Sequence, residues 1–201
     1  MHLIGLFDSI KVGRTEALVS YSADDLINIR NDAGNTVLHI AVENGHLKLL
    51  DKIKSICPRL YSIRNNEGLT PTGLACRVGK LRILQWAVIN SPEPVLNYKS
   101  NIEDDIEYPN MIQISVIYNQ PECCLWLCSE YERRQFSLDI QNSKDESLLH
   151  LAAKYDSLHC LQILVSAGTR INLKNSNNQT AAQIAHESNN KLILGQELNT
   201  I

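Results

Sequence analysis

Residues 31–46 read Asn-Asp-Ala-Gly-Asn-Thr-Val-Leu-His-Ile-Ala-Val-Glu-Asn-Gly-His. The first four predict a tight turn, because Asn and Asp bond their own backbone and Gly34 accepts a positive φ. The apolar spacing that follows predicts a short helix that opens at Thr36 and ends at Gly45. A helix with one narrow apolar stripe cannot bury it alone, so this unit requires neighbours of the same shape.

The same turn-and-helix pattern recurs along the chain with a nearly constant period. A second copy begins at Asn65 and ends at Gly79, which stands 34 residues after Gly45. Each copy is introduced by one apolar residue, one long polar residue and one Asn: Ile29-Arg30-Asn31, Ile63-Arg64-Asn65, Ile140-Gln141-Asn142 and Leu173-Lys174-Asn175. A period of this length is typical of stacked helical repeats.

Three helix starts carry the resemblance to a known family. They read Thr36-Val37-Leu38-His39, Thr70-Pro71-Thr72-Gly73 and Ser147-Leu148-Leu149-His150, and they stand where ankyrin repeats have Thr-Pro-Leu-His. The units therefore resemble ankyrin repeats over nearly the whole chain. The resemblance implies an all-α solenoid of about six stacked helix-turn-helix units, with a degenerate fourth unit and more polar capping units at both ends.

We expect one domain over residues 1–201 with a single interruption. The period breaks at residues 91–104, where Pro92 and Pro94 exclude a helix and a run of acids reaching Glu107 resists burial. This predicts an inserted acidic loop, which costs a repeat protein little. The predicted parts are an N-terminal cap at 1–30, repeats at 31–64, 65–90, 105–138 and 139–171, and a C-terminal cap at 172–201.

Charge and hydropathy narrow the class of protein further. The formal net charge of −3 argues against nucleic acid and anionic membranes as partners, because both reward clustered Lys and Arg. No run of about eighteen apolar residues is present, so we expect no membrane span. The first residues lack the basic segment of a signal peptide, and we therefore expect a cytoplasmic or other intracellular protein.

Six cysteines could indicate disulfides or a metal site, but their positions favour neither. Cys76, Cys123 and Cys160 stand where the better copies carry core residues such as Val42 and Leu49. No Cys-x-x-Cys pair is present, so we predict no metal site and buried thiols in a reducing compartment. Gly-x-Ser-x-Gly and phosphate-binding Gly-rich motifs are also absent. We therefore predict no catalytic residues, no cofactor and a non-enzymatic role.

His39 and His150 each follow a hydroxyl residue by three positions, which could suggest a catalytic pair. The ankyrin resemblance instead implies that this His bonds the hydroxyl at the helix start and a carbonyl of a neighbouring turn. Sister units replace it with Gly73, Gln113 and Gln183. A structural bond tolerates such replacement and catalysis does not, so we predict a structural role.

Trp86 and Trp126 occupy the same position on the second helix of their units, where regular units have Lys52 and Gln162. Packing between adjacent outer helices is the interpretation we favour, because large aromatic side chains usually serve burial. A second contact surface is the alternative.

The resemblance also implies a recognition surface. Ankyrin-like arrays bind through their turn tips and through the two exposed residues before the glycine that ends the first helix. In the middle units these positions are apolar or aromatic with basic flanks, which is typical of an interface core with a charged rim. The predicted partner-binding residues are Tyr118, Tyr155, Ile117, Val78, Arg77, Lys154, Glu43 and Asn44. The alternative is that the apolar ones pack under the acidic loop.

These observations predict a monomeric module that binds another protein through its concave helix face and turn tips. Two alternatives remain: an array that targets a catalytic function held elsewhere, and an inhibitor that uses its acidic loop. The preference for Ile, Asn, Lys and Ser suggests an AT-rich genome. Short divergent ankyrin proteins of this kind are similar to effectors that intracellular bacteria deliver into host cells, although an AT-rich eukaryote or a virus would show the same composition.

Overall fold

The computed structural model describes residues 3–90 and 108–188. The chain divides into two compact units, Met1–Tyr98 and Lys99–Ile201. Both are built from helices, and the described residues contain no β-strand beyond an isolated bridge between Gln141 and Ser147. The predicted all-α repeat fold is therefore confirmed. The predicted acidic loop lies outside the described residues.

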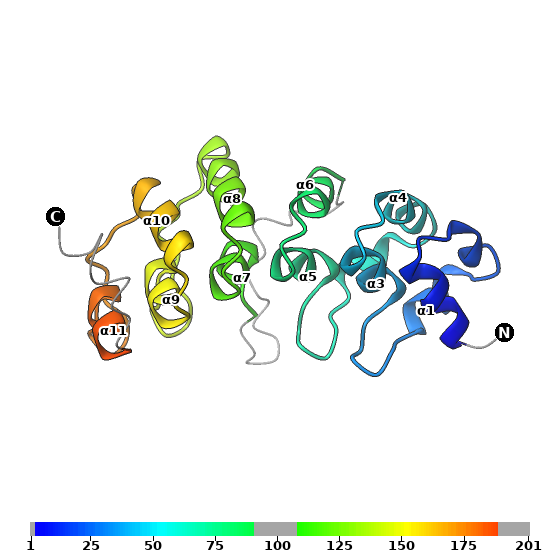
Figure 1. Ribbon diagram of the computed structural model, residues 1–201, viewed down its shortest axis with the longest axis horizontal. Coiled ribbons are helices and arrows are strands. Elements are labelled where there is room, and N and C mark those ends of the chain that lie inside the picture. The colour runs from blue at the N-terminus through cyan, green and yellow to red at the C-terminus, as the bar shows by residue number, and fades with distance from the viewer. Residues whose placement is uncertain (1–2, 91–107, 189–201) are drawn as a thin grey trace. The chain divides into compact units, whose positions relative to one another are not determined.

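The first unit packs its helices in two rows. Figure 1 shows α3 between α1 and α5 in one row, while α4 and α6 form the second row against their partner helices. The elements are α1 (Leu3–Lys11), η1 (Thr15–Leu18), α2 (Ala23–Asn28), α3 (Val37–Glu43), α4 (Leu47–Ile56), η2 (Pro58–Ser62), α5 (Pro71–Arg77) and α6 (Leu81–Asn90), where η marks a 3₁₀ helix.

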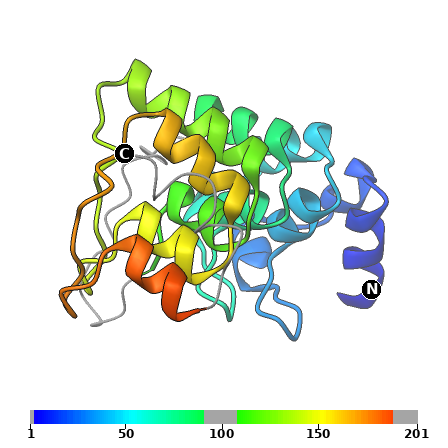
Figure 2. The same ribbon diagram turned by 60° about the vertical axis from the view of Figure 1, so that its left-hand side comes forward.

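The second unit repeats this two-row arrangement. In it α9 lies between α7 and α11, and α8 and α10 form the other row (Figure 2). The elements are α7 (Met111–Ile117), α8 (Pro121–Arg133), α9 (Leu148–Lys154), α10 (Leu158–Ser166) and α11 (Ala181–Glu187). The end of the predicted C-terminal cap lies beyond the described residues.

Helix starts and ends follow the sequence signals. Thr36 caps α3: its hydroxyl accepts a hydrogen bond from the backbone of His39, whose side chain in turn accepts from the Thr36 backbone. Gly45 then ends the helix with a φ of 80°. In the second unit Asn119 and Asp156 take this left-handed position, with φ of 48° and 54°. Asn and Asp adopt it at lower cost than other side chains, which explains how these repeats dispense with glycine.

The N-terminal cap differs from the expected helix pair. After α1 the chain forms the short η1 and then restarts as α2, because Ser22 and Asp25 form a capping box that opens a new helix.

The core of the described residues consists mainly of Leu, Ile and Ala. All six cysteines are buried and free, and the burial of Cys76, Cys123 and Cys160 agrees with the prediction from their positions in the repeat.

Candidate partner-binding surfaces

The two tyrosines predicted to bind a partner end neighbouring helices of the second unit. Tyr118 is the C-cap of α7 and Tyr155 the C-cap of α9. Their side chains are 43% and 46% exposed, which places them among the exposed large apolar residues of the described chain. Each precedes a left-handed residue, so both lie at the point where a helix turns back.

A buried hydrogen bond joins these two helix ends. The Ser157 hydroxyl donates to the Val116 carbonyl at 2.6 Å, and the Cys160 thiol lies 3.8 Å from Asn119 Oδ1. Ser157 is two residues from Tyr155, and Val116 is two residues from Tyr118. Because the packing of α7 on α9 and this bond fix both turns, the tyrosines are presented by rigid backbone.

Lys154 adds a positive charge to this region. Its ammonium lies 2.8 Å from Glu146 Oε1 and 5.9 Å from the centre of the Tyr155 ring. Burial raises the pKa of Glu146, but hydrogen bonds from Lys154 and Asn142 outweigh it and hold the pKa below its ordinary value. The pair therefore holds Lys154 beside Tyr155 at neutral pH.

The predicted residues of the first unit form a more polar set. Glu43 and Asn44 are exposed at the end of α3, and the Asn44 amide donates to the Ile40 carbonyl at 2.8 Å. Arg77 and Val78, at the end of α5, are half-buried, and Arg77 pairs with Glu67. The structure thus brings Tyr118, Tyr155, Ile117 and Lys154 together in one unit and the other four residues in the other unit. The single surface that joins the two sets stays a prediction.

His39 and His150 hold structural positions, as predicted. In each case Nδ1 accepts from the capping hydroxyl, at 2.9 Å from Thr36 Oγ1 and 2.7 Å from Ser147 Oγ. Nε2 then donates across the stack to the Leu69 and Gln179 carbonyls, both at 2.9 Å. Burial lowers the pKa of His39 to about 4, so its imidazole is neutral at physiological pH.

Cys124 and Cys128, in the second unit, are poor nucleophiles. A hydrogen bond with Cys128 lowers the pKa of Cys124, but a hydrogen bond with Cys160 and burial together raise it to about 12. The hydrogen bond with Cys124, and burial, raise the pKa of Cys128 as well. Both side chains therefore remain protonated at neutral pH. A protonated thiol is a poor nucleophile, because only the thiolate form reacts. Within the described ranges no three His, Cys, Asp or Glu side chains are grouped to hold a metal ion.

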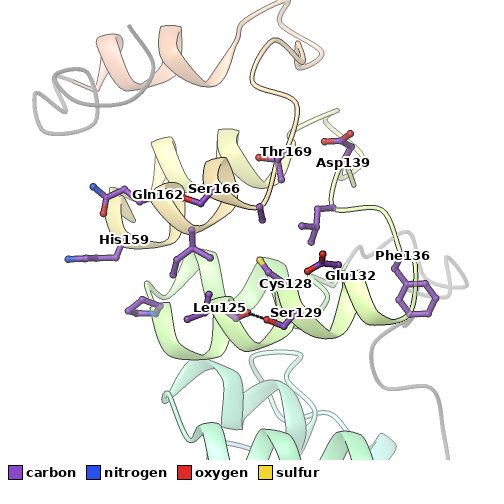
Figure 3. Close-up of a pocket in the computed structure, with 15 residues that line it drawn as sticks. Leu125, Cys128, Ser129, Glu132, Phe136, Asp139, His159, Gln162, Ser166 and Thr169 are labelled. Carbon is purple, nitrogen blue, oxygen red and sulfur yellow. Dashed lines mark hydrogen bonds between the residues drawn. The ribbon is translucent and has the colours of Figure 1, made fainter. Parts of the chain in front are cut away.

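A groove of about 770 Å³ runs between α8 and α10 in the second unit (Figure 3). Leu125, Cys128, Ser129 and Glu132 line it from α8, and His159, Gln162 and Ser166 line it from α10. The Ser129 hydroxyl donates to the Leu125 carbonyl at 3.2 Å, so this serine is bonded to its own helix and not to a base. Asp139 at the end of the groove pairs with Arg170 at 2.7 Å. The arrangement offers apolar contacts and a polar rim, but no nucleophile with its base.

Sequence reasoning missed this groove. Its clearest signal is Leu125, which stands one position from Trp126 on α8 and is 56% exposed. An exposed leucine is common by itself, and only the neighbouring helix turns it into the wall of a groove.

Trp86 packs within the first unit, which agrees with the favoured interpretation of that residue. Its ring stacks on Tyr61 with a centroid distance of 6.0 Å, and its indole N–H donates to Asp51 at 3.1 Å. Trp126 is half-buried in the second unit. The alternative interpretation, a second contact surface that contains Trp86 and Trp126, is not tested by these contacts.

Comparison with known families agrees with the repeat geometry. The family model for ankyrin repeats in three copies matches residues 111–199, and the single ankyrin repeat matches residues 33–53. The chain therefore belongs to the ankyrin-repeat family. Ankyrin repeats generally mediate interactions between proteins.

The curated relatives are much longer proteins. Mouse synphilin-1 is 28% identical over 188 residues, which are 93% of this chain and 19% of that protein. The p105 subunit of chicken nuclear factor NF-kappa-B is 22% identical over 200 residues, which are 96% of this chain and 19% of its own length. The chain thus spans about a fifth of the length of these relatives.

Two solved structures share the fold. The ankyrin-repeat domain of Bcl-3 is similar with a TM-score of 0.65 and 18% identity, over 91% of this chain and 76% of that one. A chain in the complex of a predatory endopeptidase from Bdellovibrio bacteriovorus with an immunity protein gives a TM-score of 0.67 and 19% identity, over 96% of this chain and 97% of that one. In the part of the chain that the structure describes, no helix has the length and apolar character to cross a membrane.

Proposed function

We propose that this chain is a non-enzymatic module that binds a partner protein, with Tyr118 and Tyr155 as its anchors. The observation that carries the proposal is the exposure of these two rings at adjacent helix ends that Ser157 and Val116 bond together. Tyrosine is favoured at the centre of interfaces, because it buries a large ring with little loss of side-chain entropy and keeps a hydroxyl for hydrogen bonding.

Lys154 and Ile117 extend this surface in the second unit. Lys154 is placed beside Tyr155 by Glu146, and Ile117 precedes Tyr118 at the end of α7. A lysine next to aromatic anchors supplies hydrogen-bond donors to the polar rim of such a surface. In the first unit Glu43, Asn44, Arg77 and Val78 occupy the corresponding helix ends, and we propose them as further contacts.

Rigid presentation is the mechanism we infer. The described helices pack on their neighbours before any partner arrives, so little ordering entropy is lost on association. The protonated thiols of Cys124 and Cys128 and the structural hydrogen bonds of His39 and His150 support binding over catalysis at these positions. We also propose an intracellular location, because six free buried thiols suit a reducing compartment. Delivery into a host cell stays a prediction.

Proximity labelling in cells, compared between the wild-type chain and the Tyr118→Ala/Tyr155→Ala variant, tests the proposal. Proteins labelled by the wild type and lost with the variant are then purified and their affinity for both chains measured. We expect the double variant to bind at least about tenfold more weakly, as is usual when anchor residues are truncated. Circular dichroism establishes that the fold is kept.

Leu125→Ala serves as the matched control. It also removes an exposed apolar side chain from the second unit, but from the groove between α8 and α10. We expect it to leave partner affinity unchanged. If the tyrosine variant binds as well as the wild type while it stays folded, the proposed surface is wrong, and a loss confined to Leu125→Ala would move the interface to the groove.

A further inference from the structure

A second groove, in the first unit, lies between α2 and η2. Its volume is about 910 Å³. Ile27, Pro58 and Ile63 supply apolar walls, while Arg30, Arg59 and Ser62 supply hydrogen-bond donors, with Asp24 as the acidic residue among the lining side chains. It is thus an apolar groove with two guanidinium groups. None of the predicted partner-binding residues lies on the elements that form it.

Arg30, which lines this groove, has one unsatisfied donor. Its Nη1 atom is buried and has no hydrogen-bond partner. Burial lowers the pKa of Arg30, which reflects the cost of holding a cation away from water. Within the described residues neither Arg30 nor Arg59 takes part in an ion pair. Buried donors are nearly always bonded to protein or to ordered water, so an unbonded guanidinium nitrogen on a residue that lines a groove is unusual.

Comparison with the next repeat shows that this is not the ordinary state of the position. Arg64 stands 34 residues after Arg30, in the same Ile-Arg-Asn triplet. Its Nη1 donates to the Gly68 carbonyl of its own turn at 2.5 Å. The Arg30 Nη1 atom makes no such bond to the matching carbonyl of Gly34, although its turn has the same sequence pattern. Arg30 therefore retains an unbonded donor, whereas Arg64 uses the matching donor within its own turn.

We propose that this groove binds an acidic peptide segment of a partner protein, with one carboxylate held by Arg30 and Arg59 and an adjacent apolar side chain against Ile27 and Ile63. The site goes beyond the tyrosine surface, because it lies on other elements and needs none of its residues. Guanidinium groups match the two oxygens of a carboxylate through paired N–H donors, which makes such contacts both strong and directional.

Charge favours a carboxylate over a phosphate group. Two arginines and Asp24 give the lining a net charge of +1, which a carboxylate of charge −1 balances. A phosphate dianion would leave excess negative charge beside Asp24. The apolar walls also exceed what a free anion can use, whereas a peptide can fill them with a neighbouring side chain.

Fluorescence anisotropy with short labelled peptides tests the site on the full chain. The probe is acetyl-Leu-Glu-Leu-Glu-Leu-amide, and the comparison peptide has Gln in place of each Glu. We expect saturable binding of the Glu peptide that weakens as salt is raised, and at least about tenfold weaker binding of the Gln peptide. A phosphoserine peptide of the same frame separates a phosphate site from a carboxylate site.

Three variants distinguish the site from general electrostatics. Arg30→Gln should weaken the Glu peptide about tenfold, whereas Arg82→Gln removes the same charge from an exposed position outside the groove and should change little. Tyr118→Ala/Tyr155→Ala should leave peptide binding intact, so failure of this proposal and failure of the tyrosine surface are separable.

The stability of Arg30→Met completes the test. Because Nη1 has no partner in the free protein, its removal should leave the thermal midpoint unchanged or raise it. A large decrease would identify Arg30 as a structural residue and overturn the proposal. Equal losses from Arg30→Gln and Arg82→Gln, equal affinity for Glu and Gln peptides, or tighter binding of the phosphoserine peptide would also overturn it.

Discussion

Ser157 Oγ donates a hydrogen bond to the carbonyl of Val116 at 2.6 Å, and this bond ties the turn after α9 to the end of α7. Ser157 is completely buried, so water does not compete with its hydroxyl for this hydrogen bond. The bond therefore links repeat stability with the placement of Tyr118 and Tyr155.

Ser157→Ala should lower the free energy of unfolding by about 1 kcal/mol, because it removes a buried hydrogen bond while the Val116 carbonyl still accepts from the backbone N–H of Asn119. Urea denaturation followed by circular dichroism measures this change. Ser129→Ala is the control: its exposed hydroxyl bonds only the Leu125 carbonyl of its own helix, so we expect a change within about 0.5 kcal/mol. Equal effects of the two variants would mean that the bond to Val116 adds nothing to stability.

Glu146→Gln should release Lys154 from its position beside Tyr155. At pH 7 we expect a loss of about 1 kcal/mol, since Glu146 is nearly buried but Lys154 is 41% exposed and partly screened by water. The pKa of Glu146 is lowered in the folded protein, so the pair stabilises the fold at any pH above 4.5, the ordinary pKa of a glutamate. This contribution disappears as the pH falls below that value. A double-mutant cycle with Lys154→Gln isolates the pair, and a coupling energy near zero at pH 7 would contradict the assignment.

His39 should make the fold sensitive to mild acid. The folded protein keeps its imidazole neutral down to about pH 4, whereas the unfolded chain takes up a proton near pH 6.5. The unfolded state thus binds more protons in this window, and the free energy of unfolding falls as the pH decreases, by about 3 kcal/mol in total. Above pH 6.5 the contribution is complete.

Denaturation of His39→Gln across this pH range checks the assignment. Gln113 already caps α7 by accepting from the Asn110 backbone at 2.9 Å, so an amide can serve at this position. We expect the variant to be less stable at pH 7 but to lose most of the slope between pH 6.5 and 4. His159→Gln alters an exposed histidine and should keep the wild-type slope, and an unchanged slope in His39→Gln would refute the prediction.

Gly34 and Gly45 separate backbone strain from steric conflict. Both have positive φ, of 71° and 80°. A Cβ on Gly45 would meet nothing within 4 Å, so Gly45→Ala should cost only the left-handed strain of about 1 kcal/mol. A Cβ on Gly34 would lie 2.8 Å from the backbone nitrogen of Asn66 in the next turn, and Gly34→Ala should cost roughly 3 kcal/mol. Thermal unfolding compares the two, and equal costs would show that the turns separate freely.

The repeat unit could be predicted because its signals are local. Thr36 and Gly45 announce the start and end of α3 through their own backbone preferences, which do not depend on distant residues. The period then predicts that such units pack on each other, since each leaves an apolar stripe uncovered. For the same reason the burial of Cys76, Cys123 and Cys160 and the structural role of His39 followed from their positions in the repeat.

Other features depended on where neighbouring repeats place their side chains. Arg30 and Arg64 stand at the same position of the Ile-Arg-Asn triplet in successive repeats. Arg64 bonds its own turn, whereas Arg30 leaves a buried donor unpaired. Leu125 forms a groove wall only because α10 lies beside α8. The sequence by itself therefore determined the repeat and its helix ends, because those arise within one repeat. The tertiary structure alone decided which donors stay unsatisfied and where grooves open. Both depend on the packing of neighbouring repeats, whose surface residues vary while the helical scaffold stays constant.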